Sequence, residues 1–191
     1  SAKDGGLQKA LDSAGPGNTV SIGSGTYSDV ALELKDGGSG KAKMKCIEGV
    51  DTGKGLPIFK SDFTKAKPER SGRILLTVDA GVSNWSVRKL RVENYNIAVK
   101  FKGRHHDVLV EGIEVKETRD AFWIDGGASD SELNAGSHDM TFKDCNVKLF
   151  TKRAFRIVNG NRKLDFVNCH ADGGGREWYV EVFPVGFQVV D

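Results

Sequence analysis

The sequence predicts an all-β protein built as a single-stranded parallel β-helix, a solenoid in which one chain winds through stacked coils. Three observations lead to this prediction. Short strands with alternating apolar and polar residues fill most of the 191 residues, glycines separate them, and the second half repeats with a period of about 23 residues. Such a period is typical of a solenoid, because one coil cannot bury its apolar face without a neighbour.

The chain begins with one amphipathic helix. Leu7, Ala10, Leu11 and Ala14 fall on one face of the segment 7–14, and the breakers Gly15-Pro16-Gly17 end it. An open coil exposes strand edges and apolar surface. We therefore expect this helix to cap the N-terminal end of the solenoid.

Alternation with a period of two replaces helical periodicity after the Pro-Gly turn. It predicts four strands in the first half of the chain, at residues 19–22, 30–34, 43–47 and 74–78. The interval 51–72 shows no periodicity of its own, so we expect a loop there.

Four segments of the second half align when they are written from Asn84, His106, His138 and Arg162. All four inward columns are apolar, namely Trp85/Val108/Met140/Leu164, Val87/Val110/Phe142/Phe166, Leu90/Ile113/Cys145/Cys169 and Val92/Val115/Val147/Ala171. A further strand is predicted in each repeat, at residues 97–101, 121–124, 154–157 and 178–182. Its inward columns are Val99/Phe122/Phe155/Val180 and Phe101/Ile124/Ile157/Val182.

These repeats form one domain over residues 1–191, with about seven coils. Residues 126–136 lengthen one repeat and should form a loop on one side of the coil. The last residues, 185–191, look like another strand. That end of the solenoid therefore either continues into further coils or is covered by a partner, self-association included.

Composition excludes several classes of protein. The chain has 28 basic and 26 acidic residues and a net charge of +2, which does not favour nucleic acid as a partner. No apolar run is long enough to cross a membrane. Cys46, Cys145 and Cys169 lack metal-binding spacing. We expect the stacked Cys145 and Cys169 to be thiols rather than a disulfide.

Three runs near the start carry a family resemblance: Leu7-Gln8-Lys9-Ala10, then Gly15-Pro16-Gly17-Asn18-Thr19-Val20, then Gly23-Ser24-Gly25-Thr26-Tyr27-Ser28-Asp29-Val30. Together they resemble the first coil of the polysaccharide lyase family that contains alginate lyases and chondroitinase B. The resemblance implies a right-handed parallel β-helix of the pectate-lyase-like superfamily with a short N-terminal capping α-helix. It also implies a secreted or periplasmic location. The family's Asn, Gly-Glu and Lys-Ser region is missing here, so its catalytic residues are not carried over.

The outward column of the last strand in each repeat carries the candidate chemistry. It contains Lys100, Trp123, Arg156 and Glu181, about 5 Å apart along the stack. An aromatic ring can stack on a sugar, and a guanidinium can hold a carboxylate. β-Elimination from a uronic acid needs a base, a cation and an acid. We assign Lys100 and Arg156 as catalytic candidates.

Neighbouring residues extend this surface. Trp123 and Glu181 are predicted to bind substrate together with Tyr179, Lys102, Lys152 and Arg153. The last two belong to a basic run that can bind carboxylate, sulfate or phosphate groups; it consists of Lys148, Lys152, Arg153, Arg156, Arg162 and Lys163. The alternative is a solubilising face whose counter-charges are Glu117, Asp120 and Asp144.

Calcium is a common helper in acidic-sugar lyases of this resemblance. Asp125, Asp130 and Glu132 offer oxygen ligands, although calcium needs six to eight oxygens and these three need backbone and water to complete the shell.

Two functional hypotheses follow. The first is a lyase-like β-helix protein that cleaves an acidic, uronic-acid-containing polysaccharide by β-elimination. The second is a non-catalytic β-helix used for glycan binding, adhesion or assembly.

Overall fold

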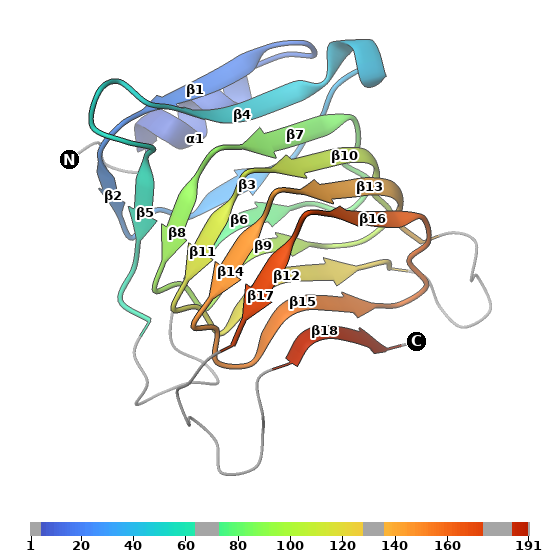
Figure 1. Ribbon diagram of the computed structural model, residues 1–191. Helices are drawn as coiled ribbons and strands as arrows, with labels where there is room; N and C mark the ends of the chain where they lie inside the picture. Colours follow the sequence, from blue (N-terminus) through green and yellow to red (C-terminus); the bar gives the residue numbers. More distant parts are fainter. Residues whose placement is uncertain (1–4, 64–72, 128–135, 174–184, 191) are drawn as a thin grey trace.

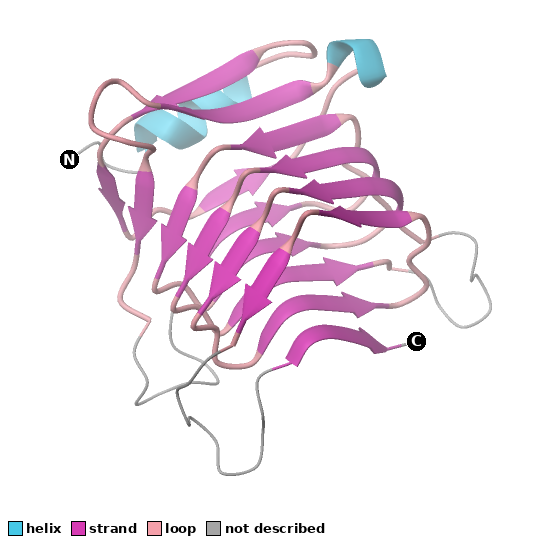
Figure 2. Cartoon of the chain, viewed as in Figure 1, coloured by secondary structure: helices cyan, strands magenta, loops and turns pink. Residues whose placement is uncertain are grey.

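Three parallel sheets wrap one elongated core and form the predicted parallel β-helix (Figure 1). The structure is a computed structural model that describes residues 5–63, 73–127, 136–173 and 185–190. Each coil contributes one strand to each sheet, as the alternation of strands and turns in Figure 2 shows. The described residues form six coils, fewer than the seven or so expected, because each sheet has six strands.

Each sheet contains every third strand of the chain. Sheet A consists of β1 (Thr19–Gly23), β4 (Lys45–Val50), β7 (Trp85–Arg88), β10 (His106–Glu111), β13 (His138–Lys143) and β16 (Leu164–Val167). Sheet B consists of β2 (Thr26–Ser28), β5 (Ile58–Lys60), β8 (Arg91–Glu93), β11 (Glu114–Lys116), β14 (Asn146–Lys148) and β17 (His170–Asp172). Sheet C consists of β3 (Leu32–Leu34), β6 (Ile74–Val78), β9 (Ile97–Phe101), β12 (Asp120–Asp125), β15 (Arg153–Val158) and β18 (Val185–Val190).

The predicted helix is α1 (Gly5–Ser13), which lies at the N-terminal end of the solenoid (Figure 1). Leu11 is buried in the core, and Leu7 and Ala14 pack against it. Gln8 fastens the helix to β3, because its side chain donates to the Glu33 carbonyl at 2.9 Å and accepts from the Glu33 amide at 2.9 Å. A single turn of 3-10 helix, η1 (Lys41–Lys43), precedes β4. Among the described residues, no helix is both long and apolar enough to span a membrane.

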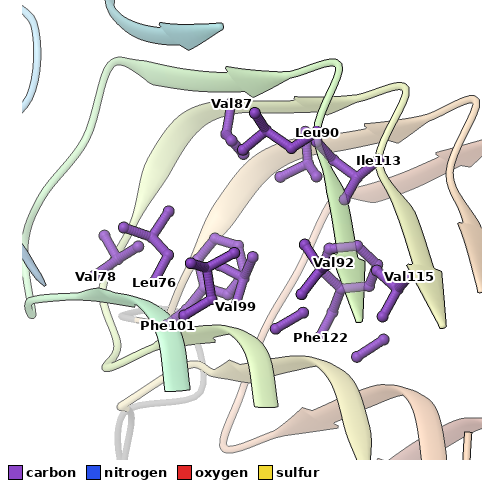
Figure 3. Close-up of a cluster of buried hydrophobic side chains, with 14 of the residues drawn as sticks. Leu76, Val78, Val87, Leu90, Val92, Val99, Phe101, Ile113, Val115 and Phe122 are labelled. Carbon is purple, nitrogen blue, oxygen red and sulfur yellow. The ribbon is translucent and has the colours of Figure 1, made fainter. Parts of the chain in front are cut away.

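The predicted inward columns are the core of the molecule. Trp85 pairs with Val108, and Val110 pairs with Phe142, in parallel register. Figure 3 shows side chains from all three sheets, such as Val87, Val92 and Val99, directed into the shared interior. Stacking equivalent apolar residues on successive coils removes them from water, which is the main force that holds the coils together.

β5 and β18 differ from the sequence expectation, and β2 was not among the strands predicted for the first half of the chain. The interval 51–72, expected as a loop, contains β5, whose buried Phe59 stacks on Tyr27 with ring centroids 5.1 Å apart. A strand of three residues is too short to show periodicity. The second difference concerns the strand beside β15: it is β18, which pairs Phe187 with Phe155, whereas the predicted 178–182 strand had aligned Val180 there. Residues 178–182 lie outside the described residues.

Single residues in the left-handed conformation turn the chain at the corners. One such column comes directly before the first inward residue of four sheet A strands, β7, β10, β13 and β16. It contains Asn84 (φ 57°), Asp107 (φ 54°), Asp139 (φ 51°) and Lys163 (φ 49°). Asn and Asp tolerate this conformation better than most residues. Their recurrence in the repeat therefore marks where each coil changes direction.

Cys145 and Cys169 are free thiols in neighbouring coils, as predicted. Burial raises the pKa of the Cys145 thiol to about 12, and the nearby Cys169 adds to the effect. The unfolded chain releases this proton near pH 9, while the folded chain keeps it. We therefore expect the free energy of unfolding to fall as pH rises from about 9 towards 12, by up to about 1.4 kcal/mol per pH unit from this group.

Urea denaturation between pH 8 and pH 11 tests this linkage. Cys145→Ala should be less stable at pH 8 because it leaves a cavity. Its stability should then decline less steeply with pH than that of the parent chain. Parallel declines in the two proteins would show that the Cys145 thiol does not contribute.

Candidate functional site

The outer face of sheet C carries the predicted row of Lys100, Trp123 and Arg156. The three residues lie side by side in the parallel register of β9, β12 and β15. Lys100 Nζ lies 4.6 Å from the centroid of the Trp123 ring, and the Arg156 guanidinium carbon lies 3.7 Å from it. Because the two cations come from the coils on either side, they cover both faces of the ring. Trp123 thus orders the two cations rather than offering an open stacking platform.

A bend at the start of β12 brings further charged residues to the same face. Regular alternation would place Asp120 inward with Phe122, but Ala121 and Phe122 both pack in the core cluster. Asp120 and its register partner Arg153 therefore project outward. Consistent with this, Arg153 Nη1 donates to Oε1 of Gln188 at 2.7 Å, and Gln188 is the residue paired with Arg156.

Asp120 and Arg153 form a buried ion pair beside the Trp123 row. Arg153 Nε donates to Asp120 Oδ1 at 2.7 Å, and Nη2 lies 3.4 Å from Oδ2. The Asp120 side chain is fully buried, and that of Arg153 is 7% exposed. Arg119 Nη1 approaches the same carboxylate at 3.7 Å. Asp120 is thus a counter-charge for the basic run, as the alternative interpretation of that run proposed.

Several cations gather around Asp120. Among the described residues there are four, which we call the sheet C cluster: Arg119, Lys152, Arg153 and Arg156. A second carboxylate, Asp125, also acts on Arg156. Burial, followed by repulsion from Arg119 and Arg153, lowers the pKa of Lys152. Burial, followed by repulsion from Arg153, also lowers the pKa of Arg156, although a guanidinium remains charged. Burial is thus the first cause of both shifts, and repulsion between the clustered cations adds to it.

Several polar groups at this site are buried without a hydrogen-bond partner. They include Nε of Arg119, Nε of Arg156 and Nε1 of Trp123. A buried donor without an acceptor costs roughly 1–3 kcal/mol. A bound anion with several acceptor oxygens would satisfy such donors.

Other predicted site residues have different roles. Lys102 donates to Asp79 at 2.8 Å and lies 3.7 Å from Glu33, and these carboxylates raise its pKa. It is neutralised and does not join the sheet C cluster. Glu181 was predicted beside Arg156, but the register places Gln188 there instead, since β18 begins at Val185. Tyr179 and Glu181 lie outside the described residues.

The basic run is divided among different faces of the coil. Lys152, Arg153 and Arg156 belong to the sheet C cluster, whereas Lys148 lies on β14 in sheet B. Lys163 lies before β16 and reaches Asp139 at 3.6 Å. Proximity in sequence does not gather these residues, because each coil turns the chain through three sheets.

The predicted calcium ligands are not brought together in the described part of the chain. Asp125 Oδ1 accepts from the Gly127 amide at 3.0 Å and from Asn159 Nδ2 at 2.8 Å, so it serves a turn. Asp130 and Glu132 lie outside the described residues. Within the described ranges, no group of three His, Cys, Asp or Glu side chains is placed to hold a metal ion.

Sequence analysis missed Arg119. It is equivalent to Lys152 in the next coil, because both immediately precede the paired residues Asp120 and Arg153. Aligning the corner residues as well as the strands would have found it.

Comparison with solved structures supports a lyase-like fold. The chain is similar to an alginate lyase from Paenibacillus sp. str. FPU-7, with a TM-score of 0.63 and 13% identity over 99% of this chain and 73% of the other. It is similar to the pectate lyase Pel9A, with a TM-score of 0.60 and 12% identity over 94% of this chain and 52% of the other. A rhamnogalacturonan lyase gives a TM-score of 0.58 and 15% identity over 95% of this chain and 56% of the other.

The chain thus spans about half the length of the last two lyases. No protein-family model and no curated protein sequence matches it. Sequence identities of 12–15% support a shared fold and not a shared reaction. With three parallel sheets around one core and one short N-terminal helix, the chain has a parallel β-helix fold similar to that of these lyases.

Proposed function

We propose that the protein is a lyase that cleaves an acidic, uronic-acid-containing polysaccharide by β-elimination on the outer face of sheet C. The observation that carries this proposal is the grouping of four cations around Asp120 in the sheet C cluster, next to Lys100 and Trp123. These cations would attract the carboxylate of a uronic acid. Such polymers lie outside the cytoplasm, so secretion or export to the periplasm is part of the proposal.

The chemistry requires a cation at the carboxylate and a base at the adjacent carbon. In β-elimination the base removes the C5 proton, the C4–C5 double bond forms, and the C4–O4 bond breaks as the leaving oxygen takes a proton. Arg156 is suited to the carboxylate, because it remains charged and its Nε has no partner. Lys152 is suited to act as the base, because its lowered pKa increases the fraction of the side chain that is a neutral amine at a given pH. Lys100 supplies a second cation.

The test measures the unsaturated product, which absorbs in the ultraviolet, with polygalacturonate, alginate and chondroitin as substrates. Arg156→Ala should lower kcat/KM about 100-fold, because it removes a charge aimed at the developing anion. The exposed Arg162→Ala is the matched control and should retain activity. In the parent, kcat/KM should rise with pH as Lys152 loses its proton, and Lys152→Arg should abolish that rise.

The outcomes separate the two functional hypotheses. Product formation that is unaffected by Arg156→Ala would place the reaction elsewhere. Binding of acidic polysaccharides without any unsaturated product would favour the non-catalytic β-helix that binds glycans. Absence of both binding and cleavage would overturn the proposal.

A further inference from the structure

The outer face of sheet B has a hollow of about 180 Å³. Three consecutive coils line it through β8, β11 and β14. Its polar lining consists of Arg91, Glu93, Glu114, Lys116, Asn146 and Lys148. None of these residues belongs to the sheet C cluster. The hollow is therefore a separate feature of the surface.

Two lysines lie next to each other at one end of the hollow. The parallel register places Lys116 directly beside Lys148. On their other sides the register places a carboxylate beside each lysine, Glu93 beside Lys116 and Asp172 beside Lys148. Among the described residues, no carboxylate lies within 4.0 Å of either ammonium group. Like charges on directly opposite positions of adjacent strands destabilise a sheet. An anion bound between the two lysines would remove this repulsion.

Asn146 gives a second, independent indication of the chemistry that a ligand in the hollow should have. Its side-chain Oδ1 is buried and has no hydrogen-bond donor. The neighbouring Glu114 in the register is directed to Arg91, with Oε2 3.0 Å from Nε. A buried acceptor without a donor is costly. A ligand in the hollow should therefore bring a hydroxyl group as well as an anionic group.

We propose that this hollow is a second, non-catalytic site that binds one acidic sugar unit of a polysaccharide. The carboxylate or sulfate group would lie between Lys116 and Lys148, and a ring hydroxyl would donate to Asn146. The proposed ligand, an acidic polysaccharide, is also the substrate class of the proposed lyase function. The choice of this ligand rests on that proposed function. A second point of attachment raises the effective concentration of the polymer at the protein, even when each contact is weak.

Equilibrium binding in a chain whose sheet C site is weakened tests the proposal. All variants carry Arg156→Ala, and the probes are polygalacturonate, a sulfated galactan and an unsubstituted galactan. Lys116→Ala/Lys148→Ala should raise Kd for the charged probes about tenfold, and Asn146→Ala should weaken the same binding. Lys54→Ala, which removes an exposed lysine from the turn before β5, should leave Kd unchanged. The two charged probes distinguish a carboxylate ligand from a sulfate ligand.

The outcomes are distinct from those of the lyase test. Weaker binding in the sheet B variants supports the second site, whether or not the parent forms unsaturated product. Equal binding by the sheet B variants and by Lys54→Ala would overturn the second site and leave the lyase proposal standing. Equal affinity for the unsubstituted galactan would also overturn it, because the lysines would then have no role. A parent that binds no acidic polysaccharide would overturn both proposals.

Discussion

Phe142→Ala should destabilise the protein by about 3–5 kcal/mol, the range for removing a fully buried phenylalanine ring. The Phe142 side chain is fully buried in β13. Its ring stacks on Phe166 with centroids 5.1 Å apart and meets Phe122 edge-on at 5.5 Å and Phe155 at 5.8 Å. Removing it leaves a cavity at the point where the aromatic columns of sheets A and C meet.

Chemical denaturation followed by circular dichroism measures this effect. Small proteins are stable by only about 5–15 kcal/mol, so the transition midpoint should fall strongly. Val167→Ala is the matched control in the next coil, since Val167 is 48% exposed and should change stability by about 0.5 kcal/mol or less. A comparable loss in both variants would show that the Phe142 contacts do not hold the coils together.

Asp120→Asn should also be strongly destabilising, by about 3–5 kcal/mol, because it leaves the Arg153 guanidinium buried without its anion. Asn keeps the shape of Asp, so the loss measures charge rather than packing. Repulsion adds to this loss, because the cations Arg119, Lys152 and Arg156 lie near Arg153. The same variant should bind an acidic polysaccharide more tightly per folded molecule, since the cluster becomes more positive.

A double-mutant cycle separates this cause from a general loss of structure. Arg153→Met removes the unpaired cation, so Asp120→Asn/Arg153→Met should be more stable than Asp120→Asn alone. Asp165→Asn, an exposed position on β16, is the control and should change stability little. If Asp120→Asn were as harmless as this control, the buried ion pair would not stabilise the fold.

Sequence alone determined the solenoid and most of its ladders. Each coil repeats the same inward columns, and apolar residues at equivalent positions can be buried only by stacking. The columns that begin at Trp85 and Val87 therefore match the register of β7, β10, β13 and β16. Alternation within regular strands also placed Lys100, Trp123 and Arg156 in one outward row.

Only the tertiary structure decided what surrounds that row. Alternation predicts the direction of a side chain as long as the strand is regular, but β12 bends where Ala121 and Phe122 both enter the core. This bend turned Asp120 outward and created the buried ion pair with Arg153. A pattern with a period of two contains no signal for such an interruption.

Corner lengths and ion-pair partners were likewise decided by packing in three dimensions. The register of the last coil followed the stacking of Phe187 on Phe155, with centroids 4.7 Å apart, rather than the first apolar alternation after β17. Lys102 pairs with Asp79 from the preceding coil, and because of this ion pair it does not join the sheet C cluster. The sequence determines which residues share a ladder, because burial recurs with the repeat. The ion-pair partner of a long polar side chain depends on distances between coils, and these are defined only in the folded chain.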